Sequence, residues 1–408
     1  MESDKSRRNL IAIIIISALG YFVDIYDLIL FSIVRVASLK SLGVAGENLL
    51  SQGVLLLNMQ MAGMLVGGII WGILGDKKGR ISVLFGSIFL YSIANLANGF
   101  VQTIPQYAAL RLIAGIGLAG ELGARITLVS EVMPKESRGY GTMVVATIGI
   151  FGAVVAALIG DYFDWRTAYF IGSGLGFILL ILRIGVYESG MYASIKSMAV
   201  SKGNFLKLFS DKKTFFKYLN CILIGVPIWF IVAILITFSP EFAKEFNIVE
   251  PISAGTAVMM CYIGLALGDF LSGALSQIFK SRKKIIQTFL IFELIAIFIY
   301  LFLNRFNAFY FYTICVTIGI TGGYWAVFVT NASEQFGTNI RATVTTTVPN
   351  FVRGAVVPVT ILFEFLRNYT GLIYSALIIG IFVIIIAFIS ARRLEETFGK
   401  DLNYLELN

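Results

Sequence analysis

Two acidic residues lie inside the first long apolar run of this 408-residue chain. Asp24 and Asp27 are three residues apart, so on a helix they share a face, and two neighbouring carboxylates compete to ionise. The chain has no histidine, so proton binding near neutral pH must use carboxylates. We therefore predict that one of the two binds and releases a proton, with Asp27 preferred to Asp24. In the alternative, Arg111 or Arg125 fixes one of them as an ion pair.

A third acidic residue, Glu121, lies in another apolar run, four residues before Arg125. Residues four apart on a helix can form an ion pair that neutralises both. The surrounding segment is rich in glycine, which exposes the backbone and leaves room for a ligand. Both interpretations stay open: Glu121 and Arg125 either neutralise each other or contribute to a proton and ligand site.

Arg353 lies at the centre of an apolar run over residues 342–366 and close to Asn350. A guanidinium cannot lose its proton in a protein, so inside a membrane it needs an anion. That anion is either a protein carboxylate, with Asp269 the first candidate, or a substrate carboxylate or phosphate. Glu293 is predicted to be structural, facing lipid or a neighbouring helix. Further polar and aromatic residues predicted to line a cavity are Tyr26, Asn58, Gln60, Trp229, Tyr324, Trp325, Asn331 and Asn350.

These residues must be positioned by membrane helices. Hydrophobic residues make up 58% of the chain and charged residues 14%, with a mean hydropathy of +0.85, whereas soluble domains carry about 25% charged residues. This composition excludes a soluble enzyme. About 20 apolar residues cross a bilayer, and the predicted fold is all-α with about twelve spans. They cover residues 10–36, 50–75, 81–101, 106–132, 140–162, 167–187, 218–239, 253–279, 285–303, 308–331, 342–366 and 370–391.

The basic residues predict the orientation of these spans. Of the 32 lysines and arginines, 23 fall on the side of the two termini and 6 on the other side. By the positive-inside rule, both termini are expected in the cytoplasm. The net charge of +8 is therefore a mark of topology and not of nucleic-acid binding. The cysteines lack metal-ligand spacing, and no metal or cofactor is expected.

The spans divide into two similar halves. A Lys- and Ser-rich stretch separates an N-terminal bundle (residues 1–187) from a C-terminal bundle (218–391), as a cytoplasmic linker over 188–217, and a short tail follows over 392–408. Glu131 and Arg138 recur as Glu334 and Arg341, at a separation of 203 residues (334 − 131 and 341 − 138). A substrate site is expected between such halves, near the middle of the membrane.

Several loop motifs resemble those of the major facilitator superfamily. The segment from Gly72 through Asp76 and Gly79 to Arg80 is similar to its signature loop between helices two and three. The resemblance implies a cytoplasmic gate that stabilises one access state. Its members here are expected to be Gly72, Asp76, Gly79, Arg80, Glu131, Arg138, Glu334 and Arg341.

The segments from Arg111 to Glu121 and from Glu131 to Gly139 resemble the metabolite:proton symporter branch, which includes phosphate and aromatic-acid symporters. In this resemblance, Arg111 pairs with the acid of helix one and adjusts its proton affinity. The chain departs from drug antiporters, because the fifth span has Gly149 and Gly152 but no Gly-Pro pair.

The expected function is proton-coupled import of a small organic anion or zwitterion by alternating access. The alternatives are a proton-coupled exporter, an uncoupled facilitator and a non-transporting membrane receptor. Expected partners are the small-molecule substrate, protons and the lipid bilayer. We expect a monomer, in a multi-pass arrangement in the cytoplasmic (inner) membrane of a bacterium, without enzymatic activity.

Overall fold

The computed structural model describes residues 2–78, 80–121, 138–188, 205–209, 211–302 and 307–400. These residues form helices joined by turns, and no strand occurs among them. The helices of the first half are α1 (Glu2–Ser41), α2 (Asn48–Lys78), α3 (Arg80–Asn98), α4 (Ile104–Leu118), α6 (Arg138–Tyr162) and α7 (Trp165–Glu188). A short 3₁₀ turn, η1 (Phe205–Phe209), precedes the second half. That half contains α9 (Lys212–Phe230), the π-helical η2 (Ile231–Ile236), α10 (Ser239–Glu245), α11 (Ala254–Ile278), α12 (Arg282–Leu301), α13 (Ala308–Gly322), α14 (Trp325–Glu334), α15 (Thr338–Gly354) and α16 (Val356–Arg393).

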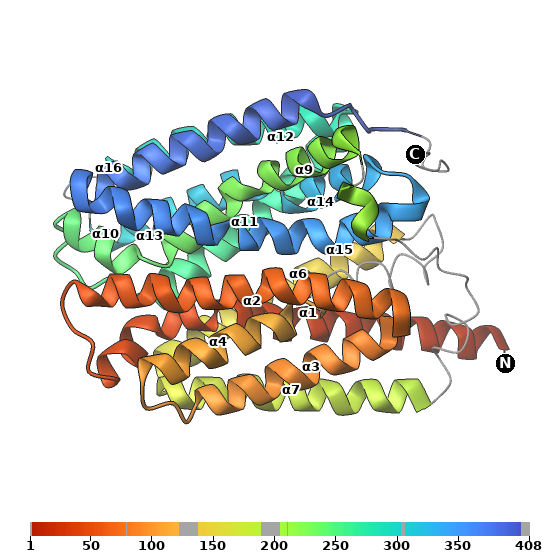
Figure 1. The fold of residues 1–408 in the computed structure, drawn as a ribbon, viewed down its shortest axis with the longest axis horizontal. Helices are drawn as coiled ribbons and strands as arrows, with labels where there is room; N and C mark the ends of the chain where they lie inside the picture. The colour runs from red at the N-terminus through yellow and green to blue at the C-terminus, as the bar shows by residue number, and fades with distance from the viewer. Residues whose placement is uncertain are drawn as a thin grey trace.

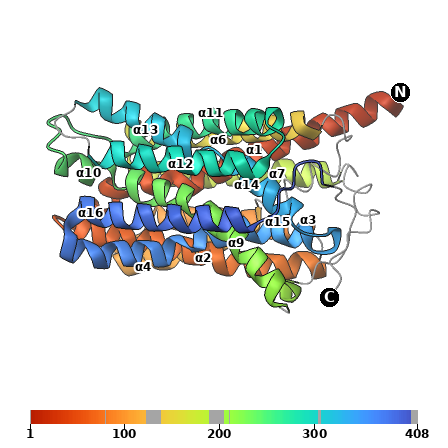
Figure 2. The same ribbon diagram turned by 90° about the horizontal axis from the view of Figure 1, so that it is seen from above.

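The helices α1 to α7 form one bundle and α9 to α16 a second, stacked above it in Figure 1. The beginning of α1 and the end of α16 lie at the same end of the molecule (Figure 1); we call the opposite end, where α10 lies, the distal end. The bundles meet where α2 packs against α15 and α16, and where α1 and α6 pack against α11. Figure 2, turned by 90°, shows α11 beside α6 and α16 beside α2.

Side-chain caps fix where several helices begin. Thr103, Asp211, Ser253, Ser281 and Asn307 each accept a hydrogen bond from the backbone N–H three residues later. These bonds satisfy amides that the first helical turn leaves without a partner. The caps therefore match the beginnings of α4, α9, α11, α12 and α13.

Two helical stretches are broken or distorted inside the apolar core, and a third is broken at an exposed glycine. Pro227 lies within α9, and the chain continues as the π-helical η2. The predicted span 308–331 is divided into α13 and α14 by a turn at Gly323 and Tyr324. In α16, Gly371 takes φ 77°, a conformation that favours glycine, and two helical segments meet there. Breaks of this kind place backbone groups where side chains from other helices can bind them.

The two halves repeat the same glycine contacts. A Cβ atom added at any of six glycines would come within 2.1–2.4 Å of a carbonyl oxygen on the neighbouring helix. They are Gly63, Gly67 and Gly115, between α2 and α4, and Gly264, Gly268 and Gly319, between α11 and α13. The paired positions are separated by 201 residues (264 − 63) and 204 residues (319 − 115). The repeat predicted from the loop motifs thus extends into helix packing, where small residues let backbones approach.

Eight segments of the described chain are long and apolar enough to cross a membrane, and three shorter apolar helices accompany them. The longest segment, Thr343–Arg393, includes the break at Gly371. The predicted all-α membrane architecture is confirmed, whereas the count of twelve spans and the orientation of the termini stay predictions.

Candidate functional site

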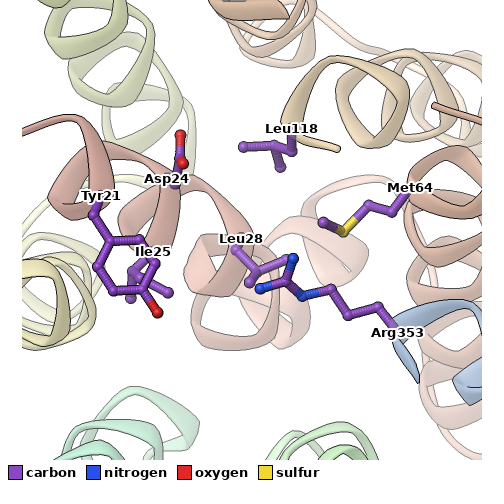
Figure 3. Close-up of a pocket in the computed structure, with 7 residues that line it drawn as sticks. All are labelled: Tyr21, Asp24, Ile25, Leu28, Met64, Leu118 and Arg353. Carbon is purple, nitrogen blue, oxygen red and sulfur yellow. The ribbon is translucent and has the colours of Figure 1, made fainter. Parts of the chain in front are cut away.

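A small cavity lies between the two bundles and brings together two of the predicted charges. Its walls come from α1, α2 and α4 on one side and α15 on the other. Figure 3 shows Arg353 extending toward Leu28 and Met64, with Tyr21 and Asp24 on α1 opposite it. The residues that line the cavity are Tyr21, Asp24, Ile25, Leu28, Met64, Leu118 and Arg353.

Arg353 has no protein anion within ion-pair distance in the part of the chain that the structure describes. The residue is 4% exposed, and no described carboxylate comes within 4.0 Å of its guanidinium. Its Nε atom also lacks a hydrogen-bond partner. Because a buried cation without a counter-ion is costly, this geometry suits a residue whose partner is a bound anion.

Two tryptophans flank the guanidinium of Arg353. Its central carbon lies 5.3 Å from the ring centre of Trp229 on α9 and 5.6 Å from that of Trp325 at the start of α14. Both distances are within the range of cation–π attraction, which stabilises a desolvated cation without neutralising it. The structure therefore brings three predicted cavity residues together, and we call Arg353, Trp229 and Trp325 the arginine cage.

Asp269 does not form the predicted ion pair with Arg353. Its Oδ1 atom accepts a hydrogen bond of 3.0 Å from the backbone N–H of Ala326, in the first turn of α14. A carboxylate is favoured at a helix N-terminus, where backbone amides have no intrahelical partner. Asp269 thus caps the helix that carries Trp325, and its role at the cage is indirect.

The two acids of α1 have different neighbours. Asp24 lines the cavity, whereas Asp27 is directed toward α7, where a Cβ atom on Gly172 would come within 2.5 Å of its Oδ1. Asp27 is 1% exposed, and neither of its oxygens has a hydrogen-bond partner among the described residues. Only Asp24 therefore faces the arginine cage across the cavity.

The expected ion pair between Arg111 and an acid of helix one is absent among the described residues. Arg111 donates to the side-chain oxygen of Gln60 and, at 3.5 Å, to the hydroxyl of Tyr169, and its guanidinium lies 4.3 Å from the ring centre of Phe31. Arg111 and Asp24 are the charged groups that act on Asp27 electrostatically. The influence of Arg111 on Asp27 is therefore exerted through space and not by direct contact.

Glu121 forms an ion pair that the sequence did not reveal. Arg183 on α7 donates to both of its carboxylate oxygens, at 3.0 and 3.2 Å, and Ser87 donates to one of them at 2.7 Å. Arg183 is 2% exposed, so this ion pair is buried. The predicted role of Glu121 in proton coupling is not supported, because the carboxylate is bound on both oxygens inside one bundle. Arg125 lies outside the described residues.

Two predicted cavity tyrosines serve instead to hold helices together. The Tyr26 hydroxyl donates to the Ala168 carbonyl at 2.8 Å, and the Tyr324 hydroxyl donates to the Ile224 carbonyl at 3.0 Å. Both rings are 0% exposed. These bonds satisfy hydroxyl groups within a single bundle, which is the usual arrangement of a buried tyrosine.

Two predicted cavity asparagines join the bundles across the interface. Asn350 on α15 donates to the Ala119 carbonyl at 3.0 Å, and Asn58 on α2 accepts from the Thr360 hydroxyl at 2.6 Å. A movement of one bundle against the other changes both contacts. They are thus interface groups next to the cavity.

The distal end is closed by polar contacts between the bundles that sequence reasoning missed. Arg35 of α1 donates to Glu241 of α10 at 2.7 Å and to the Thr237 carbonyl at 3.2 Å, and it is 0% exposed. We call the Arg35–Glu241 pair the distal latch. Asp161 of α6 accepts from Ser253 at 2.9 Å nearby. The sequence alone does not reveal that Glu241 is the partner of Arg35.

The other end carries the motif residues. In the second half, Glu334 forms an ion pair with Arg282 at 3.5 Å and accepts from Thr397 at 2.7 Å. The Nε atom of Arg341 donates to the carbonyls of Ser333 and Phe336, at 3.2 and 3.1 Å.

In the first half, Gly79, Glu131 and the side chains of Asp76, Arg80 and Arg138 lie outside the described residues. A Cβ atom on Gly72 would meet nothing within 4 Å, so no other helix packs tightly against this glycine among the described residues.

The tail is held at this same end by Glu396. Partial burial raises the pKa of the Glu396 carboxyl. Hydrogen bonds from the Ser281 hydroxyl and from the amides of Phe398, Arg282 and Lys283 lower this pKa by more than burial raises it, so the pKa of Glu396 lies below its ordinary value. The carboxylate therefore anchors the chain after α16 to the first turn of α12, where a helix favours an anion.

Comparison with known proteins identifies the family. The model of the Major Facilitator Superfamily matches residues 10–354. The chain belongs to the Major Facilitator Superfamily. A metabolite transport protein of Haemophilus influenzae is 27% identical over 304 residues, which cover 69% of this chain and 70% of that protein. The 3-(3-hydroxy-phenyl)propionate transporter of Escherichia coli is 30% identical over 173 residues, 40% of this chain and 43% of that one.

The likeness of the fold extends over the whole length. A crystallised proton:xylose symporter of the superfamily superposes with a TM-score of 0.73 at 15% identity, covering 98% of both chains. At this identity the likeness shows the fold alone. With the relatives, it indicates a multi-pass membrane transporter and not an enzyme, as the sequence predicted.

Proposed function

We propose that this transporter imports a small organic anion together with a proton. The observation that carries the proposal is Arg353, a buried guanidinium in the interface cavity that has no carboxylate within ion-pair distance in the described chain. A substrate carboxylate would provide the missing counter-ion, since a guanidinium binds a carboxylate through two parallel hydrogen bonds. Trp229 and Trp325 beside it favour a planar or apolar body on the same substrate.

The position of Asp24 supplies a reason for proton coupling. An anion bound to Arg353 would lie in the cavity that Asp24 also lines. Two negative charges in a small desolvated space repel each other strongly, so protonation of Asp24 would favour anion binding. This geometry leads us to prefer Asp24 over Asp27 as the coupling residue.

Alternating access would move the two bundles against each other. We propose twelve spans, with both termini in the cytoplasm, so that the distal end faces outward. The bundles would correspond to residues 1–187 and 218–391, with a cytoplasmic linker between them. In this orientation the distal latch closes the outer side, and its opening would admit substrate. Contacts between Asn58 and Thr360 and between Asn350 and Ala119 would also change in that movement.

Ligand-induced thermal stabilisation of the purified protein tests the anion site. Nicotinate, benzoate, 3-phenylpropionate, phosphate, amino acids, sugars and organic cations would be screened on wild type, Arg353→Ala and Arg393→Ala. Arg393 is an exposed arginine at the end of α16 and serves as the matched control. We expect a carboxylate to stabilise wild type and Arg393→Ala but not Arg353→Ala. Equal stabilisation of all three proteins would exclude Arg353 as the anion site, and stabilisation by cations alone would overturn the anion assignment.

A further inference from the structure

A second buried acid lies away from the interface cavity. Glu293 is at the middle of α12 and is 0% exposed. Neither of its carboxylate oxygens has a hydrogen-bond partner among the described residues. The sequence left open whether it faces lipid or a neighbouring helix, and its burial excludes the lipid-facing position.

Among the residues that the structure describes, the surroundings of Glu293 provide no positive charge. The helices α11, α13, α14 and α16 pack against α12. From these elements, among the residues that the structure describes, Tyr324 is the one titratable or charged group that acts on the carboxyl. Phe289, one turn earlier on α12, packs edge-on against the same tyrosine, with 6.4 Å between ring centres. Among the described residues, Glu293 is thus a buried acid on which one phenol and no charged group acts.

The hydrogen bond of Tyr324 decides which protonation state fits. Its hydroxyl carries a single proton, which is donated to the Ile224 carbonyl on α9. Toward Glu293 the phenol can therefore only accept, and only a protonated carboxyl can donate. An ionised carboxylate would have no donor in this packing, and a buried charge without a donor is strongly disfavoured. We propose that Glu293 binds a proton in this conformation, as a second proton site that is separate from the substrate cavity.

The second site is connected to the arginine cage through Tyr324. Tyr324 directly precedes Trp325, and Ile224 lies on the helix that carries Trp229. When Glu293 releases its proton to water, its carboxylate becomes a stronger acceptor than a carbonyl and competes for the Tyr324 proton. The bond between Tyr324 and α9 is then lost. A proton on Glu293 therefore keeps the two tryptophans in position; this consequence for substrate rests on the proposed function, whereas the protonation itself does not.

Infrared difference spectroscopy at pH 7 tests the protonation without any substrate. Spectra of purified wild type would be compared with those of Glu293→Gln and of Glu245→Gln, which removes an exposed carboxylate of α10. We expect Glu293→Gln to remove a protonated-carboxyl C=O band that shifts in D₂O, and Glu245→Gln to remove carboxylate bands. Loss of carboxylate bands in Glu293→Gln would overturn the proposal.

The variant Tyr324→Phe keeps the test valid if Glu293→Gln does not fold. It retains the acid and removes the hydroxyl of the phenol that acts on it, so the same C=O band is expected to move in frequency relative to wild type. An unchanged band would contradict the contact with Tyr324. Absence of anion transport would leave these spectra unaffected, so a failure of this inference and a failure of the proposed function are distinguishable.

Discussion

Removal of the charge from the distal latch is expected to open the distal end. Arg35 belongs to α1 and Glu241 to α10, so the bundles cannot separate at this end without breaking their 2.7 Å contact. A hydrogen bond to a charged group contributes about 1.5–3 kcal/mol, roughly twice a neutral one. Glu241 is 21% exposed, so the substitution Glu241→Gln should cost the closed state about 1–2 kcal/mol. At about 1.4 kcal/mol for each factor of ten, this is roughly a 5- to 30-fold change in the equilibrium.

The assay is thiol labelling of a cysteine placed in the cavity. Met64→Cys lines the cavity, and the native cysteines Cys221, Cys261 and Cys315 are buried. A membrane-impermeant reagent added from the outer side should label Met64→Cys about 5- to 30-fold faster in the Glu241→Gln background, provided that the open state is a minority. Glu245→Gln, one turn further along α10 and exposed, is the matched control and should leave the rate unchanged. Equal rates with and without the latch would refute this reasoning.

Three further predictions concern stability. In detergent, Gly319→Ala should lower the thermal midpoint of unfolding, because the new Cβ would meet a carbonyl oxygen at 2.2 Å. The control Gly273→Ala lies in the same half, where a Cβ meets nothing within 4 Å, and should leave the midpoint unchanged or raise it. Equal effects of the two substitutions would contradict the helix contacts. Glu121→Gln and Arg183→Met should each lower the free energy of unfolding by roughly 3–5 kcal/mol, because each removes one partner of a buried ion pair. The double variant should lose less than the sum of the two single losses. Strictly additive losses in denaturant unfolding would mean that the two residues do not interact. Glu396 has a lowered pKa in the folded protein, so its ionised form stabilises the fold. This stabilisation should be complete above the unfolded pKa of about 4.3 and be lost as the pH falls through the folded pKa. The thermal midpoints of wild type and Glu396→Gln should therefore converge in acid, and a difference that stays constant with pH would refute this.

The sequence predicted the helices and the charges inside them, because hydrophobic length and intramembrane charge are properties of single segments. Arg353 and Asp24 could be assigned to a central site on these grounds. The choice between Asp24 and Asp27 could not be made from the sequence, because spacing along one helix does not show which neighbouring helix each side chain faces. In the structure Asp27 faces α7, where Gly172 leaves room for its carboxylate.

Pairing partners could not be predicted, because they depend on contacts between distant segments. Spacing suggests Arg125 as a partner of Glu121, but it gives no sign of Arg183, 62 residues away, which the structure shows bound to Glu121. A signal was present: Arg183 falls within the predicted span 167–187, and a buried arginine needs an acid. Asp269 is a similar case, since the break before α14 that it caps is created by the fold around Gly323.

The repeat offers a general route to such contacts. The glycines at α2–α4 and α11–α13 keep nearly constant separations along the chain, and comparing the halves for glycines would have located both interfaces. Other contacts do not repeat, because the first bundle contains the Glu121–Arg183 pair whereas the second contains Glu293 and Tyr324. The buried charged sites away from the interface cavity therefore differ between the two bundles.

Uptake into proteoliposomes under an imposed pH gradient tests the central proposal most directly. A radiolabelled carboxylate selected by thermal stabilisation, or nicotinate and benzoate as probes, would be supplied outside at acidic pH to vesicles that contain wild type, Asp24→Asn, Arg353→Ala or Arg393→Ala. We predict accumulation driven by the gradient for wild type and Arg393→Ala, loss of accumulation with retained exchange for Asp24→Asn, and no transport for Arg353→Ala. Wild-type uptake that is indifferent to the gradient, or undiminished transport by Arg353→Ala, would contradict proton-coupled anion import at this site.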